Sequence, residues 1–428
     1  KKIYGVFSRK SLSRNFEGIE FADEDTLKKI IKDNLLFAMG LIVFDDPENS
    51  WENGFPSNLG TVELTVALHK VFSSPYDKLI FDVGHQTYTH KILTGRSKYF
   101  DTLRKKNGLA GFLKYSESEH DVWEAGHSST SISAATGFLE AKEAGANMGD
   151  VVVIIGDGSL PNGLSLSGLN YLGSQKNQKA IIILNDNDMS ISKNVGRLAK
   201  RFSKLRINRS YSRLKRMVPR FLYRLFHSIK LGIQSIIYGN NIFTALGYKY
   251  YGPIDGHNLK EMIRYLNFAK GSKESVILHV KTVKGKGYMF AENDDVGIWH
   301  GVGPFDIVTG NSKKKRNGYE IPWGTGMTKI LLEIAKTKDS MRVITPAMIG
   351  GSHLDEFVEK FPQQLIDVGI AEEHAAAMAA GLSLNGLYPV ASIYSTFLQR
   401  TYDQINHDIC RNNHSVCFLI DRSGINGG

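Results

Sequence analysis

The sequence VVVIIGDGSLPNGLSLSGLNYLGSQKNQKAIIILNDNDMSIS, residues 151–192, contains two apolar runs that both end in oxygen-bearing side chains. Residues 151–155 are followed by Gly-Asp-Gly, and residues 180–184 are followed by Asn-Asp-Asn. Short β-branched runs joined by a helical segment are typical of parallel strands that helices cover on both faces. Ligands of such sheets bind at the carboxyl ends of the strands, so we expect both clusters to line one ligand site.

The alternation of apolar runs and helical segments continues along the chain and forms two sets. The first set adds KLIFDVG (78–84) and SVILHVKT (275–282); the second consists of RVITPAM (342–348), QLIDVGI (364–370), YPVASIY (388–394) and SVCFLIDR (415–422). A polar segment rich in Gly, Lys and Asn, residues 306–324, separates the sets and is typical of a linker. A chain of 428 residues is also expected to form two domains.

We therefore predict an α/β protein with two parallel-sheet domains that carry helices on both faces. The first domain is expected at residues 25–305, the linker at 306–317 and the second domain at 318–428, with residues 1–24 as a separate N-terminal segment. The second sheet is expected to be incomplete, because the sequence stops at DRSGINGG directly after a strand.

Composition predicts a soluble cytoplasmic protein. Hydrophobic residues make up 42% of the chain, and the longest apolar runs have the length of a strand, so we expect no membrane span. The two cysteines, Cys410 and Cys417, are typical of a reducing compartment, although organellar import stays open. The net charge of +10 is local, because residues 197–230 hold twelve Lys and Arg and no acid. We interpret that stretch as an amphipathic helix with a basic face rather than a membrane or RNA contact, and we expect no nucleic-acid partner.

The two polar clusters have the chemistry of a magnesium site. Mg²⁺ binds oxygen ligands and is usually shared between a few protein oxygens and a phosphate. The Asp157 carboxylate and an amide oxygen of the second cluster could bind the ion from two strand ends, and the glycines beside Asp157 allow the backbone to approach a phosphate closely. The alternative is a simple turn at Gly-Asp-Gly, which would leave the matching second cluster unexplained.

Many long motifs resemble those of the 1-deoxy-D-xylulose-5-phosphate synthase family, whose transketolase-like members depend on thiamine diphosphate. The resemblance covers about residues 57–428 and rests on DVGHQTYTHKILTGR (82–96), EAGHSSTSISAATG (124–137), LNDNDMSIS (184–192), GPIDGHN (252–258), TVKGKGYMFAEND (282–294), WHGVGPFD (299–306), VITPAM (343–348), DVGIAEEHA (367–375) and SIYSTFLQRTYDQI (392–405). It implies a thiamine diphosphate-binding fold and an enzyme that acts as a transferase.

The resemblance also implies a set of cofactor contacts. Mg²⁺ would be bound by the side chains of Asp157 and Asn187 and by the carbonyl of Met189; alignment on NDNDMSIS favours Asn187 over Asp186. The residues expected to contact thiamine diphosphate are His85, Gly126, His127, Ser128, Asp157, Gly158, Asn187, Tyr288 and Glu372. The serines after His127 also predict the start of a helix, and a helix N-terminus is itself favourable for a diphosphate.

Glu372 corresponds to the catalytic glutamate of the family, which hydrogen-bonds the aminopyrimidine ring and promotes loss of a proton from the thiazolium ring. The alternative is an exposed Glu-Glu pair with Glu373. Arg400 and Tyr394 are expected to contact the substrates, and the Arg400 guanidinium is expected to bind the phosphate of the acceptor substrate. His300 is a candidate for proton transfer, although a single histidine after a strand is often structural.

The activity implied by the resemblance is the decarboxylative condensation of pyruvate with D-glyceraldehyde 3-phosphate. Its product would feed the methylerythritol phosphate pathway to isoprenoids, and thiamine and pyridoxal synthesis; a homodimer is expected. The chain departs from the family at Gly54, where a histidine is usual, at Ser167, where a glutamate is usual, and at its end. A related enzyme with altered substrates and a non-catalytic cofactor-binding fragment are therefore the alternatives.

Overall fold

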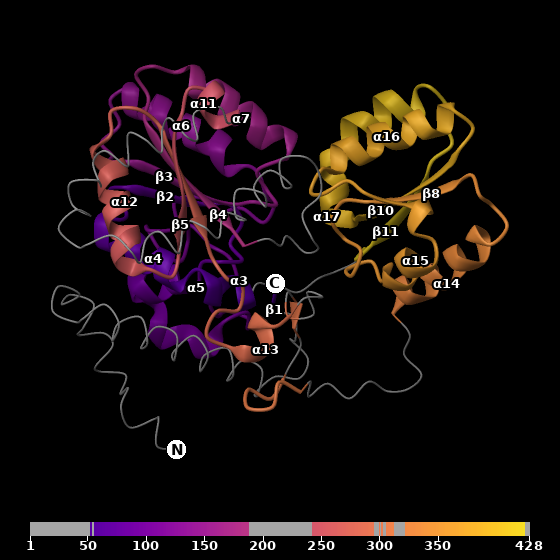
Figure 1. Ribbon diagram of the computed structural model, residues 1–428, viewed down its shortest axis with the longest axis horizontal. Coiled ribbons are helices and arrows are strands. Elements are labelled where there is room, and N and C mark those ends of the chain that lie inside the picture. Colours follow the sequence, from indigo (N-terminus) through magenta and orange to yellow (C-terminus); the bar gives the residue numbers. More distant parts are fainter. Residues whose placement is uncertain are drawn as a thin grey trace, which may run out of the picture.

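The computed structural model describes residues 52–53, 55–187, 242–294, 299, 301–302, 305–311 and 322–423. Several sequence predictions lie outside these residues: the N-terminal segment 1–24, the basic stretch 197–230, and the positions of Gly54, Met189 and His300. Within the described residues, two parallel sheets form the centres of two α/β units (Figure 1). The predicted fold class is therefore confirmed.

The first sheet has five parallel strands in the order β2-β3-β4-β6-β5. The strands are β2 (Lys78–Phe81), β3 (Val151–Gly156), β4 (Ala180–Asp186), β5 (Lys249–Asp255) and β6 (Val276–Lys281). Alternate residues of β3 face opposite sides of the sheet. Val152 and Ile154 join the core beneath α4 (Val62–Val71) and α12 (Leu259–Gly271), while Val153 and Ile155 join the core beneath α6 (Ser131–Glu143) and α7 (Gly163–Ser174). Helices on both faces explain why residues 151–155 and 180–184 are apolar at every position.

The second sheet has four parallel strands in the order β11-β10-β8-β9. Its strands are β8 (Met341–Thr345), β9 (Leu365–Asp367), β10 (Tyr388–Tyr394) and β11 (Cys417–Asp421). On one face, leucines of α14 (Trp323–Ala335) pack with Phe357 of α15 (Asp355–Lys360) against Val343 and Val390. On the other face, alanines of α16 (Glu372–Leu384) pack against Ile344 and Ile393. In Figure 1, α16 covers one face of this sheet and α14 and α15 the other, and α17 (Ser395–Leu398) lies on the side of the unit that faces the first unit.

The helices of the first unit are α3 (Phe55–Gly60), α4 (Val62–Val71), α5 (Tyr88–Lys91), α6 (Ser131–Glu143), α7 (Gly163–Ser174), α11 (Ile242–Ala245), α12 (Leu259–Gly271) and α13 (Met289–Glu292), with a π-turn at Ile92–Arg96 and a 3₁₀ turn at Ser97–Thr102. The second unit has α14 (Trp323–Ala335), α15 (Asp355–Lys360), α16 (Glu372–Leu384) and α17 (Ser395–Leu398), 3₁₀ turns at Pro362–Gln364 and Gln399–Thr401, and a π-helix at Gln404–Cys410. Two short strands, β1 (Glu52–Asn53) and β7 (Gly301–Val302), pair antiparallel.

All eight apolar runs form strands at the predicted places, whereas β5 has no counterpart among the predicted strands. Among the described strands, β5 lies at the sheet edge and pairs only with β6, and it contains Gly252 and Pro253, both of which weaken a strand signal in sequence. The described start of the predicted linker contacts the first unit, since the Ile307 carbonyl accepts a hydrogen bond from the Tyr288 hydroxyl. The domain boundaries stay a prediction.

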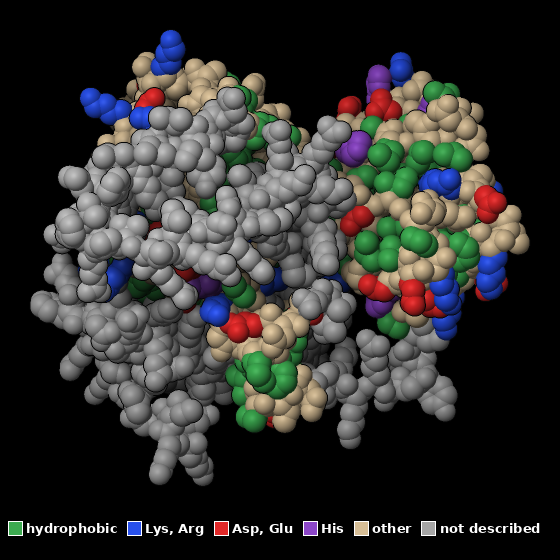
Figure 2. Space-filling view, viewed as in Figure 1, with side chains coloured by type: hydrophobic (Ala, Val, Ile, Leu, Met, Phe, Trp, Pro, Cys, Tyr) green, Lys and Arg blue, Asp and Glu red, His purple; other side chains and the backbone are tan. Residues whose placement is uncertain are grey.

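The surface of the second unit carries charges of both signs. In the space-filling view, Lys and Arg side chains are interspersed with Asp and Glu on the face drawn (Figure 2). Within the described part of the chain, none of the helices is both long enough and apolar enough to span a membrane.

Candidate active site

The two polar clusters of the opening sequence lie next to each other at the carboxyl ends of β3 and β4 in the first sheet. Gly156 of β3 pairs with Asn185 of β4, and the Asp157 amide donates to the Asn185 carbonyl at 3.1 Å. The side chain of Asp157 is buried, with an exposed fraction of 4%. The prediction that these clusters share one sheet edge is therefore confirmed.

Asp186 and Asn187 differ in their surroundings. The Asp186 carboxylate lies 2.7 Å from Nε2 of His279, and both side chains are fully buried. The other ring nitrogen of His279 lies 2.6 Å from the Tyr250 hydroxyl. Since the Asp186 charge is used in this internal network, Asn187, which directly follows β4, is the better candidate to provide an oxygen at the strand ends.

The GHQ motif after β2 contributes His85 and Gln86 to the same edge. The Asn58 side chain of α3 holds this turn, donating to the His85 carbonyl at 2.8 Å and accepting from the Tyr88 amide at 2.8 Å. Gln86 is buried; its Oε1 accepts from Asn185 at 3.3 Å, while its Nε2 has no hydrogen-bond partner among the described residues. A buried donor without an acceptor is unfavourable, so this amide is suited to an anionic ligand at the strand ends.

Lys284 is a candidate site residue that the sequence reasoning missed. Burial lowers its pKa to about 8, against the opposing charges of Asp294 and Asp157. Burial and the positive charge of Lys284 also lower the pKa of His85 to about 4. Lys284 therefore provides positive charge close to both Asp157 and His85. Its position between Val283 and Gly285 in the quoted TVKGKGY motif was the available signal.

Tyr288, the predicted cofactor contact in the same motif, lies in an aromatic cluster. Its ring is 5.3 Å from Trp299, 5.5 Å from Phe290 and 5.9 Å from Phe305, and its hydroxyl donates to the Ile307 carbonyl. Burial and the nearby Asp306 charge raise the pKa of Tyr288 to about 12. We infer a packing role for its ring and leave its cofactor contact as a prediction.

The Gly-His-Ser-Ser loop, residues 126–129, is held by buried Asp82 at the end of β2. One carboxylate oxygen accepts from the Ser129 amide at 2.8 Å, and the other accepts from the Ser131 hydroxyl at 2.7 Å and from its amide at 3.2 Å. Ser129 has a φ of 73°, a left-handed conformation that is uncommon for a residue with a side chain. Its hydroxyl donates to the carbonyl of Ser159, two residues after Asp157, at 2.9 Å. These contacts fix the loop beside the Gly-Asp-Gly turn.

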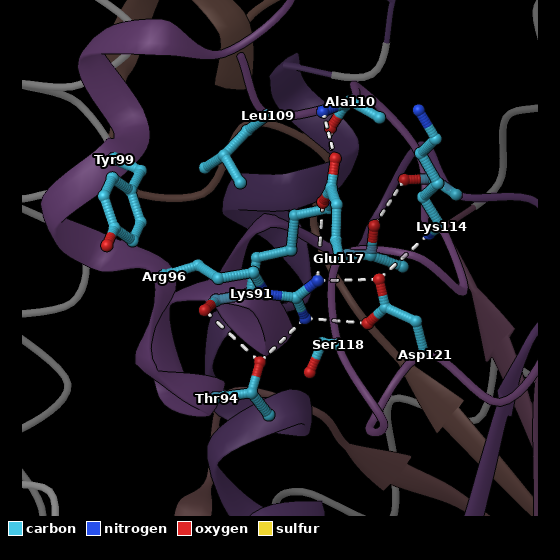
Figure 3. Close-up of polar contacts among 12 residues, drawn as sticks. Lys91, Thr94, Arg96, Tyr99, Leu109, Ala110, Lys114, Glu117, Ser118 and Asp121 are labelled. Carbon is cyan, nitrogen blue, oxygen red and sulfur yellow. Dashed lines mark hydrogen bonds and ion pairs between the residues drawn. The ribbon is translucent and has the colours of Figure 1, made fainter. Parts of the chain in front are cut away.

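A buried network of ion pairs holds the segment that leads into this loop (Figure 3). The Arg96 guanidinium donates two hydrogen bonds to Asp121, at 2.6 and 2.7 Å. Lys91 lies 2.6 Å from the Glu117 carboxylate and donates to the Ala110 carbonyl at 2.8 Å. The network therefore anchors the irregular segment between residues 103 and 123 to α5 and the π-turn that follows it.

The second unit contributes Glu372 and Arg400. Glu372 is the first residue of α16 and has an exposed fraction of 3%; one Arg400 nitrogen lies 3.3 Å from its Oε2. The other Arg400 nitrogen donates to the Ser128 carbonyl of the first unit. Burial raises the pKa of Glu372, the Arg400 charge opposes this rise, and the Glu373 charge adds to it. Because Glu372 is buried, the alternative interpretation of this motif as an exposed pair of Glu372 and Glu373 is wrong.

His127 and Tyr394 are brought to the same boundary between the units. Nε2 of His127 lies 3.1 Å from the Thr396 hydroxyl, and its ring is 5.2 Å from Phe397. Burial and then the Arg400 charge lower the pKa of His127. Tyr394 is buried and stacks on Phe397 with ring centres 6.0 Å apart. The structure therefore brings the GHSS loop, the start of α16 and the STFLQR segment together.

The comparison with known sequence families identifies both units. A family model described as 1-deoxy-D-xylulose-5-phosphate synthase matches residues 50–282, which is more than half of the chain. The chain belongs to the 1-deoxy-D-xylulose-5-phosphate synthase family. A second model, described as the pyrimidine binding domain of transketolase, matches residues 319–428.

Curated relatives in the 1-deoxy-D-xylulose-5-phosphate synthase family are about half identical to the chain. The protein of that name from Macrococcus caseolyticus is 50% identical over 380 residues, which span 87% of this chain and 60% of that protein. Those from a Geobacillus species and from Geobacillus thermodenitrificans are 49% and 48% identical, with 86% of this chain and 60% of each relative covered. The chain thus spans about 60% of the length of these relatives.

Two solved transketolase structures align with this chain. The match to the enzyme from Campylobacter jejuni has a TM-score of 0.47 at 17% sequence identity. It covers 93% of this chain and 70% of that enzyme. The match to the enzyme from Leishmania mexicana has a TM-score of 0.46 at 14% identity and covers 91% of this chain and 68% of that enzyme.

The departures from the family motifs fall in different places. Ser167, at the position of the family's glutamate, lies on the exposed side of α7, and Gly54 lies outside the described residues. Met189 and His300 also lie outside them, so their roles stay predictions. Among the described residues, no group of three or more His, Cys, Asp or Glu is arranged to bind a metal ion.

Proposed function

We propose that this chain catalyses the synthesis of 1-deoxy-D-xylulose 5-phosphate from pyruvate and D-glyceraldehyde 3-phosphate, with thiamine diphosphate and Mg²⁺. The observation that carries the proposal is the contact of Arg400 with both Glu372 and the Ser128 carbonyl. This contact links the buried acid of the pyrimidine-binding unit to the Gly-His-Ser-Ser loop of the first unit. Family membership and the match to the transketolase pyrimidine-binding domain support the choice of cofactor.

The residues at the strand ends suit a magnesium-bound diphosphate. Asp157 and Asn187 offer oxygen ligands of the kind that Mg²⁺ prefers, and the Met189 carbonyl would be a third. The buried Gln86 Nε2 without a partner and the positive charge of Lys284 both favour an anion here. At Gly156, no described atom lies within 4 Å of where a Cβ would be, so there is space beside the strand end. His85, Gly126, His127, Ser128, Gly158 and Tyr288 are the further proposed contacts.

Glu372 would hold and transfer a proton at the aminopyrimidine ring. A buried carboxyl with a raised pKa keeps its proton at higher pH, which suits proton exchange near neutrality. When bound, thiamine diphosphate would supply its thiazolium ring as the sink for the electron pair that decarboxylation leaves on C2 of pyruvate. In the net reaction the bond between C1 and C2 of pyruvate breaks and CO₂ leaves. C2 then bonds to the aldehyde carbon of the acceptor, whose oxygen takes up a proton.

The Arg400 guanidinium and Tyr394 are proposed to bind the acceptor, Arg400 through paired hydrogen bonds to its phosphate. His300 is proposed to transfer a proton to the substrate. We also propose a homodimer in the cytoplasm whose product enters the methylerythritol phosphate pathway and thiamine synthesis. Cys410 and Cys417 are both free thiols, which is compatible with a reducing compartment.

The test is to measure CO₂ release from labelled pyruvate with and without D-glyceraldehyde 3-phosphate, and to identify the sugar phosphate product. The proposal expects thiamine diphosphate- and Mg²⁺-dependent CO₂ release, with 1-deoxy-D-xylulose 5-phosphate formed when both substrates are present. Cofactor-dependent CO₂ release with a different product would indicate altered substrates, for which Gly54 is the first position to restore to histidine. Cofactor binding without turnover would refute the proposal.

A further inference from the structure

Asn162 connects the two units by hydrogen bonds from one buried side chain. It is the N-cap residue of α7, and its Oδ1 accepts from the Leu164 amide at 2.9 Å. Its Nδ2 donates to the Ile370 carbonyl at 3.0 Å and to Oε1 of Glu373 at 3.1 Å. The residue has an exposed fraction of 3%.

The contacts of Asn162 exceed what a helix cap requires. An N-cap needs only an acceptor, so Asp or Ser would satisfy the Leu164 amide equally well. A neutral amide also has two donor hydrogens, and here Nδ2 meets two acceptors on a segment more than 200 residues away in the sequence. The side-chain amide of Asn162 therefore holds the segment that contains Ile370 and Glu373, in addition to capping α7.

The two ends of this connection belong to the two halves of the proposed site. Asn162 follows Asp157 in the turn after β3, and the backbone amide of Asn162 donates to the Ser159 carbonyl at 3.4 Å. Ile370 and Glu373 lie on either side of Glu372 at the N-terminus of α16. A displacement of Asn162 therefore moves the start of α16 relative to the strand end that carries Asp157.

We propose that Asn162 is a positioning residue that clamps the start of α16 and sets the place of Glu372 relative to Asp157. The inference rests on the proposed function, since it concerns the cofactor that both residues would bind. Glu373 is the acceptor that makes the clamp specific. Its Oε2 is buried with no hydrogen-bond partner among the described residues, so Nδ2 of Asn162 is the donor seen on this carboxylate.

The decisive variant is Asn162→Asp. Aspartate has the size of asparagine and is an equally good N-cap, but it has no donor hydrogens and places a negative charge against Glu373. We expect the dissociation constant for thiamine diphosphate with Mg²⁺ to rise about tenfold or more. Adding Glu373→Gln should recover most of this loss, because the glutamine amide can donate to the introduced aspartate in the reverse direction. Recovery in the double variant would show that the loss arises from the contact between residues 162 and 373 and not from residue 162 alone.

Two controls separate the clamp from helix capping. Asn258 caps α12, accepts from the Glu261 amide at 3.2 Å and donates to the Glu261 carboxylate at 3.3 Å, all within one helix. Asn258→Asp therefore makes the same chemical change without a contact between the units, and its cofactor affinity should stay within twofold of the parent. Asn162→Gly, a change that costs a cap only a few tenths of a kcal/mol, should weaken the cofactor by a smaller factor that Glu373→Gln does not restore.

The same variants should be unfolded by denaturant without cofactor, so that the clamp is tested apart from the proposed function. The proposal expects Asn162→Asp to lower the midpoint and Glu373→Gln to raise it again in the double variant. If the parent does not bind thiamine diphosphate, the proposed function fails and this unfolding cycle alone decides the clamp. If the parent binds and Asn162→Asp matches Asn258→Asp in both measurements, or Glu373→Gln rescues neither, the clamp is refuted. If Asn162→Asp does not fold, Asn162→Gly decides: the clamp expects weaker cofactor binding and a lower midpoint than in Asn258→Asp, and a match with Asn258→Asp in both measurements refutes it.

Discussion

The substitution Asp121→Asn tests whether the buried ion network supports the Gly-His-Ser-Ser loop. Asp121 accepts two hydrogen bonds from Arg96, at 2.6 and 2.7 Å, and one from the Lys114 amide at 2.9 Å. Its side chain is fully buried, and that of Arg96 is 6% exposed. Asparagine keeps the shape but removes the charge and turns one acceptor into a donor, which would face Arg96, Lys114 or His90.

The size of the effect follows from the burial of both partners. Removal of one partner from a buried ion pair costs about 3–5 kcal/mol, because the other charge is left without compensation. We expect about 3 kcal/mol, the lower end of that range, since the amide oxygen still accepts one bond from Arg96. The segment up to residue 123 should loosen with it, and thiamine diphosphate affinity should fall.

The pH dependence of this loss is fixed by the shift of Asp121. Burial acts to raise its pKa, but the nearby His90 imidazole, the hydrogen bonds and charge of Arg96 and the Lys114 amide together hold the pKa well below its ordinary value. A lowered pKa in the folded state gives stability that is present above the unfolded pKa of about 3.9 and is lost as pH falls through the folded pKa. The difference between parent and variant should therefore be full at pH 7 and shrink below about pH 4.

The assay is denaturant unfolding followed by tryptophan fluorescence, since Trp123 lies two residues from Asp121 and its indole donates to Thr130 at 3.2 Å. The control is Glu356→Gln, which breaks an exposed pair with Lys360. An exposed pair of that kind contributes little to stability, because solvent screens the two charges. If Asp121→Asn changes stability no more than Glu356→Gln does, the network does not anchor this segment.

Three further predictions concern the proposed site. Asp157→Ala and Asn187→Ala should each abolish Mg²⁺-dependent binding of thiamine diphosphate, measured by calorimetry. Asp186→Ala should mainly lower stability, because the buried imidazole of His279 loses its carboxylate partner. If Asp157→Ala binds the cofactor within threefold of the parent affinity, Asp157 does not bind the metal. Since the pKa of Lys284 is about 8, cofactor affinity should fall as pH rises from 7 to 9 in the parent, and Lys284→Met should weaken binding about tenfold at pH 7 and remove this slope; an unchanged slope would exclude Lys284. Arg400→Ala should raise the KM for D-glyceraldehyde 3-phosphate by the equivalent of about 2–4 kcal/mol while the KM for pyruvate changes little, and equal effects on both substrates would assign Arg400 to the scaffold.

The strands and the sheet edge could be predicted because their signals are local. A continuous apolar run such as residues 180–184 indicates a strand covered on both faces without reference to any other segment. The meeting of Asp157 with the second polar cluster followed from the rule that parallel strands present their carboxyl ends at one edge. The edge strand β5 was missed because a half-exposed strand with Gly252 and Pro253 lacks that apolar continuity.

The contacts across the site could not be predicted from one sequence, because they join residues far apart in the chain. Nothing local to Asn162 indicates that it donates to Ile370, 208 positions later, rather than only capping its helix. The sequence predicts Arg400 as a phosphate ligand. Its contacts with Glu372 and the Ser128 carbonyl could not be predicted, because they depend on how the two units pack. Lys284 lay inside a recognised motif, but its shifted pKa arises from burial and from charges that only the fold brings near.

The most direct test of the proposed function is hydrogen–deuterium exchange at the thiazolium C2 of bound thiamine diphosphate, measured by quenched NMR in the parent and in Glu372→Gln. Glutamine keeps the shape and a hydrogen bond but cannot exchange a proton with the aminopyrimidine ring, while Asp157 and Asn187 remain to hold the cofactor. We predict fast exchange in the parent and exchange at least about 10²–10⁴-fold slower in the variant, the range typical of proton transfer by a side chain. Fast exchange in both proteins would remove Glu372 from the mechanism, and slow exchange in both would contradict the assignment of this chain as a thiamine diphosphate enzyme.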